Sequence, residues 1–179
     1  MNNSFLSHAL KWGGIIGGIS IFVSLLLYFV HLELLLSISF SFLFFVVIIV
    51  LLVYSGKLYR KSVGGYIDFK TIFLTLYVTS LVFIVLSTGY NLALFAIDSN
   101  AYENYVTAQM NNQESRLEFF GVEDGDAFDD AMEATKDELE RNMGTASTLQ
   151  GMLISAGVFL VVTLIIGAVL KKEKPIFED

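Results

Sequence analysis

The sequence predicts an all-α polytopic membrane protein with four transmembrane helices and a helical hairpin between the third and the fourth. Two observations on composition support this fold class. The 179-residue chain is 55% hydrophobic, whereas soluble domains contain ~45–50% apolar residues. Its net charge of −7 is concentrated in one region, so long stretches carry no charge. Four of these stretches reach the length of about 20 apolar residues that a bilayer core of ~30 Å requires.

The four predicted spans cover residues 9–30, 34–54, 71–97 and 149–170 and form a single membrane domain over residues 1–179. The first span resembles a signal peptide in its position. Its apolar run is too long, however, and no small-residue cleavage pattern follows it. We therefore expect the first span to stay attached.

Basic residues beside the spans predict the orientation, because short segments rich in Lys and Arg stay in the cytoplasm. The segment between spans two and three carries Lys57, Arg60, Lys61 and Lys70, and span four is followed by Lys171 and Lys172. We expect the N- and C-termini to be cytoplasmic. The short turn at residues 31–33 and the loop at residues 98–148 then lie on the other side.

Small residues on spans one and four predict where helices pack, since lipid removes the hydrophobic drive for association and close backbone approach replaces it. Two overlapping pairs spaced by four occur on span one, and a row with the same spacing occurs on span four. The packing candidates are Gly13, Gly14, Gly17, Gly18, Gly151, Ser155, Thr163 and Gly167. The glycine pairs favour packing within the chain, with homodimerisation as the alternative.

A polar seam follows roughly one face of span three. It consists of Tyr77, Ser80, Ser87, Thr88 and Asn91. These side chains either bond to neighbouring helices, which is their common role in membranes, or line a polar path. No span has Asp, Glu, His or Arg in its apolar core. This argues against an ion-coupled transporter, because coupling relies on such groups.

The motifs of several common enzyme and cofactor sites are absent from the sequence. There is no cysteine, and the two histidines, His8 and His31, are predicted to lie on opposite sides of the membrane. Zinc-protease, serine-hydrolase and phosphate-loop motifs do not occur. We therefore expect a protein that is not an enzyme, holds no cofactor or metal and binds no nucleic acid.

The loop at residues 98–148 is strongly acidic, with 13 Asp and Glu residues against Arg116, Lys136 and Arg141. Two stretches flank the glycines at 121 and 125. The second has a helical stripe that consists of Phe128, Met132, Thr135, Leu139 and Met143. We expect an extracytoplasmic antiparallel hairpin that continues spans three and four outward for ~30 Å at 1.5 Å per residue.

The carboxylates near the tip of this hairpin raise the question of a cation site. Their spacing does not fit an EF-hand, because Phe128 and Asp129 occupy positions that a ligand and the turn glycine need. Helix capping and a solvated acidic face are therefore favoured. The charge either attracts a basic partner or deters unwanted contacts, and the sequence leaves both open.

Several short patterns match one known layout. They are the glycine-rich segment 13–18, Arg60-Lys61 followed by Gly64-Gly65-Tyr66-Ile67-Asp68-Phe69, Ile97-Asp98 with Tyr102-Glu103 beyond it, and Lys171-Lys172. In these the chain resembles the bacterial membrane-protein family labelled domain of unknown function 4199. Members often have Pro after the Asp that closes span three, whereas Ser99 here would let the helix run on. The resemblance implies a bacterial inner-membrane protein and assigns no functional residues.

Two functions follow as hypotheses. The first is an envelope scaffold or interaction component that meets a protein partner, or a second copy, through the acidic hairpin or the glycine-rich first span. The alternative is a small oligomeric channel or uncoupled transporter lined by the seam of span three. A sensor is a third hypothesis, although the short cytoplasmic segments hold no visible output module.

Overall fold

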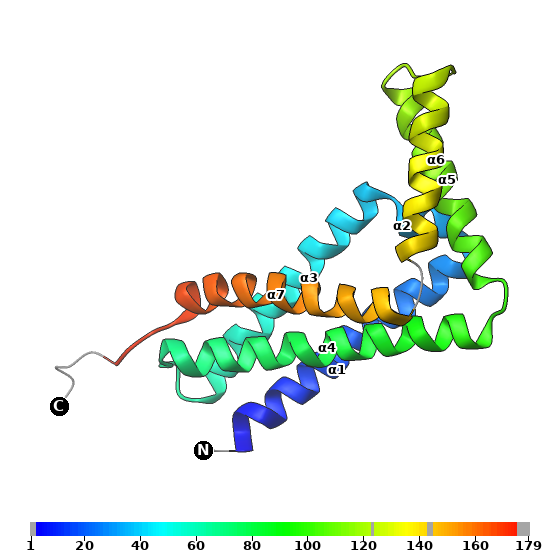
Figure 1. Ribbon diagram of the computed structural model, residues 1–179. Helices are drawn as coiled ribbons and strands as arrows, with labels where there is room; N and C mark the ends of the chain where they lie inside the picture. The colour runs from blue at the N-terminus through cyan, green and yellow to red at the C-terminus, as the bar shows by residue number, and fades with distance from the viewer. Residues whose placement is uncertain (1–2, 123, 143–144, 175–179) are drawn as a thin grey trace. The chain divides into compact units, whose positions relative to one another are not determined.

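The computed structural model describes residues 3–122, 124–142 and 145–174, which form seven helices and no strand (Figure 1). Four helices are long and apolar enough to cross a membrane, namely α1 (Asn3–Val30), α3 (Ile38–Ser62), α4 (Phe69–Ile97) and α7 (Thr145–Leu170). The others are α2 (Leu32–Leu36), α5 (Ala101–Phe119) and α6 (Asp126–Asn142). The predicted all-α fold with four candidate spans is confirmed.

The second span lies further along the chain than the predicted residues 34–54. Helix α3 begins at Ile38 because Ser37 precedes it as a cap, with its Oγ accepting the N–H of Phe40 at 3.3 Å. At the other end, α3 continues to Ser62 and includes Arg60 and Lys61. Basic side chains in a last turn are favoured by the helix dipole, so the helix takes in residues that we had assigned to a loop.

The third span and the hairpin are separate helices, so the predicted continuation of one into the other is wrong. Helix α4 ends at Ile97, and Asp98 forms the turn before α5. The Oδ1 of Asp98 accepts the N–H of Asn100 at 2.9 Å, and its carbonyl accepts the N–H of Ala101 at 3.1 Å. Aspartate competes with the helix by making such bonds to its own backbone. Ser99 therefore does not carry the helix on.

The chain divides into two compact units, and each is described by itself. The first comprises Met1–Ile21, Phe45–Ser87 and Met152–Asp179. Its core contains the fully buried side chains of Ile16, Leu52, Ile72 and Leu76. The aromatic rings of this unit extend the core, because the ring of Phe159 lies 5.2 Å from that of Phe83 and 5.8 Å from that of Phe45.

Loop contacts tie the end of α7 to the α3–α4 connection within the first unit. Ile67 and Lys172 exchange two backbone hydrogen bonds of 2.8 and 2.9 Å. Arg60 donates to the carbonyl of Leu170 at 3.1 Å. The connection turns through Gly64 and Gly65, whose φ angles of +91° and +86° favour glycine. These contacts bring the two basic segments of the sequence to the same end of the unit.

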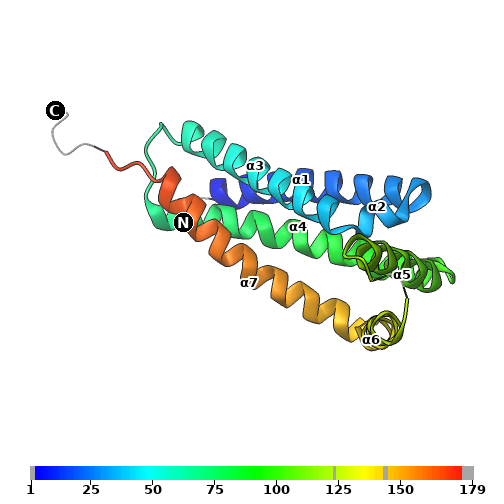
Figure 2. The ribbon, with the colours of Figure 1, turned by 90° about the horizontal axis from the view of Figure 1, so that it is seen from above.

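The second unit comprises Phe22–Phe44 and Thr88–Gly151. Helices α5 and α6 pack side by side in opposite directions, and α2 packs on α5 (Figures 1 and 2). Helix α5 turns Ala101 and Ala108 inward, and both are buried. The helical stripe of α6 lies half-buried at Phe128, Met132, Thr135 and Leu139, and its last predicted member, Met143, lies outside the described residues.

Candidate functional site

Hydrogen bonds between distant segments of the second unit position α5. The hydroxyl of Tyr28 donates to Asp98 Oδ2 at 2.5 Å, and the Asn104 amide donates to the Tyr28 hydroxyl at 3.5 Å. Further along, the Asn111 amide donates to the Glu33 carboxylate at 2.7 Å, and the Asn112 amide donates to the Glu33 carbonyl at 2.9 Å. The bonded residues follow the same order along α5 and along the segment from Tyr28 to Glu33. Helix α5 therefore lies against the end of α1 and then against α2.

An aromatic cluster supports the same contact. The ring of Tyr105 lies 6.0 Å from that of Tyr28 and 5.3 Å from that of Phe95. Burial raises the pKa of Tyr105 to about 12, with smaller contributions from Tyr90 and Tyr28. The Tyr90 hydroxyl is itself buried without a hydrogen-bond partner among the described residues. Tyr105 is therefore a fixed anchor of α5 and stays neutral at physiological pH.

Asp98 is the charged member of this cluster. The hydrogen bond from Tyr28 lowers the pKa of its carboxyl group, and the Asn100 N–H adds to the effect. Because the carboxylate accepts these bonds in its ionised form, it holds the end of α4, the end of α1 and the start of α5 together. The sequence singled out Asp98 only as a residue of the family pattern.

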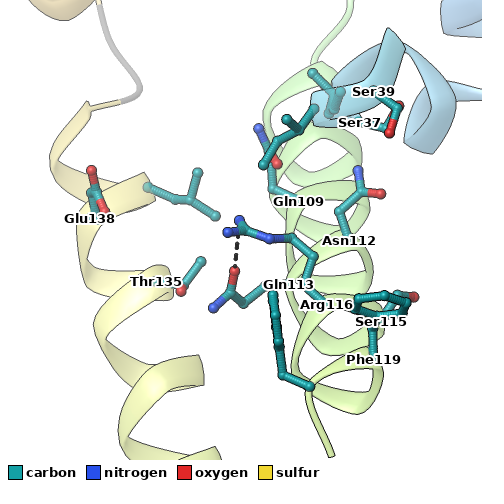
Figure 3. A pocket seen from close by; sticks show the side chains of 14 residues that line it. Ser37, Ser39, Gln109, Asn112, Gln113, Ser115, Arg116, Phe119, Thr135 and Glu138 are labelled. Carbon is teal, nitrogen blue, oxygen red and sulfur yellow. Dashed lines mark hydrogen bonds between the residues drawn. The ribbon is translucent and has the colours of Figure 1, made fainter. Parts of the chain in front are cut away.

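A pocket of about 570 Å³ lies between α5, α6 and the start of α3. Figure 3 shows Arg116 reaching from α5 into the space toward α6, with its guanidinium bonded to the Gln113 amide oxygen at 3.3 Å. Thr135 and Glu138 come from α6, and Ser37 and Ser39 stand at the beginning of α3. Leu36, Ile38, Phe119, Phe120 and Leu139 supply the apolar walls.

The tip of the hairpin carries two exposed aromatic side chains. Phe119 is 84% exposed and Phe120 is 75% exposed, and their rings meet edge to face at 5.5 Å. The chain leaves α5 through Gly121 and enters α6 after Gly125, which have φ angles of +76° and +91°. These two glycines permit the tight connection that puts both phenylalanines at the end of α5.

The seam residues of α4 have different surroundings. Ser80 is buried and donates to the Leu76 carbonyl of its own helix at 3.0 Å, and Tyr77 stacks on Phe73. The Ser87 hydroxyl is buried without a hydrogen-bond partner among the described residues. Thr88 and Asn91 are half-buried. In the described part of α4, these side chains do not form one connected hydrogen-bonded row.

The two glycine pairs of α1 also differ. A Cβ atom on Gly13 would lie 2.5 Å from Val82 Cβ and 2.8 Å from the Thr79 carbonyl oxygen, and one on Gly17 would lie 2.8 Å from a Leu86 methyl carbon. Gly14 and Gly18 have nothing within 4 Å of such an atom. The first pair therefore lies at the contact between α1 and α4, while the second faces open space.

The predicted packing residues of α7 also differ in their surroundings. A Cβ atom on Gly167 would lie 3.4 Å from the Phe73 backbone, and Thr163 is fully buried. Ser155 is half-buried, and Gly151 is exposed with nothing near it. Sequence reasoning missed Gly56, where a Cβ atom would lie 2.6 Å from a Leu170 methyl carbon. No second glycine stands four residues away, so the spacing rule gave no signal there.

His8 forms a second polar cluster that the sequence did not predict. Its Nε2 lies 3.1 Å from the Ser55 carbonyl oxygen and 3.2 Å from the Ser55 hydroxyl. Its ring lies 4.9 Å from that of Tyr59, and Trp12 meets Tyr54 edge-on at 5.6 Å. The cluster joins α1 to α3. Nothing local in the sequence links His8 to a serine 47 positions away.

The carboxylates of the hairpin do not converge in the described ranges. No group of three or more His, Cys, Asp or Glu side chains there is placed to hold a metal ion. Glu123, which belongs to the acidic run near the tip, lies outside the described residues. The arrangement in the second unit therefore offers contact surfaces and pockets with polar linings.

Comparison with known proteins identifies the family. The model of the family described as Protein of unknown function (DUF4199) matches residues 11–172. No curated protein and no solved structure matches the chain. The matched region runs from the first turns of α1 to the Lys172 contact beyond α7 and includes the hairpin. The chain belongs to the DUF4199 family.

Proposed function

We propose that this chain is a non-enzymatic integral membrane protein that binds a protein partner through the tip of the α5–α6 hairpin. The exposed pair Phe119 and Phe120 carries the proposal. Most of the other exposed large apolar side chains lie on the span helices, where lipid covers them. Adjacent exposed aromatic rings outside the spans have no such cover, and aromatic residues are enriched at the centres of protein interfaces.

Charge favours a basic partner surface. The segment at residues 98–148 carries 13 acidic residues against three basic ones, and the polar face of α6 is exposed. An acidic surface around an aromatic centre attracts a basic protein over long range and orients it before contact. The same charge opposes insertion of the tip among anionic lipids.

The hairpin is also held in place before any partner arrives. Helix α5 is bonded to Glu33 through Asn111 and Asn112 and to Tyr28 through Asn104. A surface that is already ordered loses less conformational entropy on binding. This supports a docking role for the α5 end of the hairpin.

The membrane placement is part of the proposal. Arg60, Lys61 and Lys172 lie at one end of the first unit, joined by the contacts to Leu170 and Ile67. Basic residues at span ends favour the cytoplasmic side. We infer a bacterial inner membrane with cytoplasmic termini, so that the hairpin and its partner lie outside the cytoplasm.

Photocrosslinking in intact cells tests the partner role. A photoreactive amino acid at Phe119 or Phe120 should trap a protein, and the same residue at Leu153, which is 72% exposed on α7, should trap lipid. Replacing Glu118 by Gln and Asp124 by Asn should reduce the protein adduct several-fold by weakening electrostatic attraction. If neither position traps a protein, the partner role of the tip is wrong.

The channel alternative has weaker support. Ser80, Thr75 and Thr79 all donate their hydroxyl groups to carbonyls of α4 itself. Hydroxyls bonded in this way offer less to a passing solute than free ones do. Solute flux through reconstituted protein that disappears on Asn91→Leu would favour the channel over the docking role.

A further inference from the structure

We propose that the pocket between α5, α6 and the start of α3 binds the head group of a zwitterionic phospholipid. In this arrangement Arg116 holds the phosphate, and Glu138 receives the ammonium group. Both residues line the pocket, one from each helix of the hairpin (Figure 3). The inference rests on this pocket and does not depend on the partner proposed for the tip.

The guanidinium of Arg116 has donors that are free to bind an anion. In the described part of the chain its guanidinium bonds the Gln113 amide oxygen at 3.3 Å and has no acidic partner. Its neighbours three and four positions away on α5 are Asn112, Gln113, Phe119 and Phe120, which are the residues that share its helix face. The guanidinium therefore keeps donors available for an anion, and its fork matches phosphate oxygens.

Further hydrogen-bond donors surround this cation. Gln109, Gln113 and Ser39 line the same pocket. Amide and hydroxyl groups of this kind bond phosphate oxygens without adding charge. The first turn of α3, which is 25 residues long, is part of the wall, and its positive dipole end adds a smaller attraction for an anion.

The surrounding charge selects a zwitterion over an anion. The strongly acidic hairpin repels a ligand that carries net negative charge. A ligand that brings its own ammonium group avoids this cost, and Glu138 supplies a carboxylate at the edge of the pocket, on the side of α6 away from Arg116 (Figure 3). A primary ammonium has three N–H donors for such a carboxylate, whereas a trimethylammonium has none. The chemistry therefore fits a phosphoethanolamine head group.

The position of the pocket points to a lipid as the source of that head group. Ile38, the first residue of the candidate span in α3, lines the pocket and is 63% exposed. Phe42 follows one turn along the same face and is 69% exposed. An acyl chain attached to the bound head group would continue along these two side chains. A soluble phosphodiester gains nothing from them.

Native mass spectrometry of the purified full chain tests the proposal by lipid titration. Phosphatidylethanolamine, phosphatidylcholine and phosphatidylglycerol with identical acyl chains serve as probes, with glycerophosphoethanolamine as the soluble probe. We expect phosphatidylethanolamine to bind most tightly. Arg116→Gln should weaken it about tenfold, as expected for the loss of charge-assisted hydrogen bonds. Glu138→Gln should reduce phosphatidylethanolamine to the level of phosphatidylcholine.

Arg141→Gln is the matched control. This arginine also belongs to the hairpin, but it donates to the Asp137 carbonyl of its own helix at 3.1 Å and does not line the pocket. Its replacement should leave lipid binding unchanged. Equal losses in Arg116→Gln and Arg141→Gln would overturn the proposal, because net charge alone would then explain binding.

The other outcomes are equally decisive. Phosphatidylglycerol binding as tightly as phosphatidylethanolamine would overturn the choice of a zwitterion, and equal binding of glycerophosphoethanolamine would overturn the lipid source. If circular dichroism shows that Arg116→Gln is unfolded, Arg116→Lys replaces it and should bind less tightly than the unchanged protein, because lysine lacks the planar fork. None of these results alters the crosslinks at Phe119, so failure here is distinct from failure of the partner role.

Discussion

The two units combine packing and hydrogen bonds differently. The first unit also has hydrogen bonds between helices, at His8 with Ser55 and at Arg60 with Leu170, but its α1–α4 contact depends on close packing. In the first unit, α1 meets α4 at Gly13 and Gly17, and the buried hydroxyls of Thr79 and Thr163 bond to carbonyls of their own helices. In the second unit, side chains bond across helices, as between Tyr28 and Asp98. Lipid-embedded helices associate by close packing. The five-residue helix α2 needs specific polar partners, because isolated short helices are marginal in water.

This difference predicts that the first unit responds mainly to side-chain volume and the second mainly to charge. Gly13→Leu should have the largest effect, a loss of about 3 kcal/mol, because overpacking a tight contact costs this much. The added Cβ atom would lie 2.5 Å from Val82 Cβ and 2.8 Å from a backbone oxygen. Neither atom moves without shifting α4. Reversible unfolding in mixed detergent micelles measures the change.

Gly14→Leu is the matched control for this substitution. It lies one residue away on α1, and nothing stands within 4 Å of its added Cβ atom. Removal of a helix glycine should then leave stability unchanged or raise it by a few tenths of a kcal/mol. A large loss of stability in Gly14→Leu would show that a second copy of the chain packs at this glycine. The first unit would then be stabilised by a contact between chains as well as by the packing of α1 on α4.

Sequence reasoning could find the glycine rows but could not tell them apart. Both pairs on α1 have the same spacing, and only the position of α4 distinguishes Gly13 from Gly14. Gly56 has no glycine at the same spacing, so the sequence does not mark it as a packing residue. Its close neighbour Leu170 lies far away in the sequence. Composition and helix length predict that spans exist, whereas the contacts between them depend on how each helix is rotated.

Asp68 tests whether charge matters within the first unit. Its carboxylate accepts the Thr71 N–H at 2.9 Å and the Thr71 hydroxyl at 2.6 Å, and it caps the start of α4. These bonds lower the pKa of Asp68. Asp68→Ala should cost about 1 kcal/mol, the usual effect of losing an N-cap. Thermal unfolding at pH 7 measures the loss, and Asp68→Asn should restore most of it, since asparagine also caps. A loss of stability as large as that of Gly13→Leu would show that charge matters as much as side-chain volume in the first unit.

The candidate site could also be predicted only in part from the sequence. The helical stripe of α6 and the glycines at the tip predicted the hairpin, because those signals are local. The bond between Glu33 and Asn111 joins residues 78 positions apart, and no periodicity encodes it. Nor could the sequence show that, among the described residues, Arg116 bonds to Gln113 and to no carboxylate, since Glu114 and Glu118 stand two positions away on either side.

Asp98 provides the smallest and most specific prediction, a pH dependence confined to the second unit. The hydrogen bond from Tyr28 lowers the pKa of its carboxyl group in the folded chain. Its stabilising contribution is therefore complete above the ordinary aspartate pKa of about 3.9 and is lost as the pH falls through the folded value. The effect should be small, because water competes for this partly exposed carboxylate.

Near-UV circular dichroism of the tyrosine bands between pH 6 and pH 2.5 measures this transition, because Tyr28 and Tyr105 stack beside Asp98. The titration is best made in an Asp68→Asn background, which removes the other aspartate with a lowered pKa. Asp98→Asn should abolish the acid change in the tyrosine signal, and Tyr28→Phe should move its midpoint to higher pH by removing the bond that favours the ionised form. An unchanged transition in both variants would mean that this contact does not couple α1 to α5.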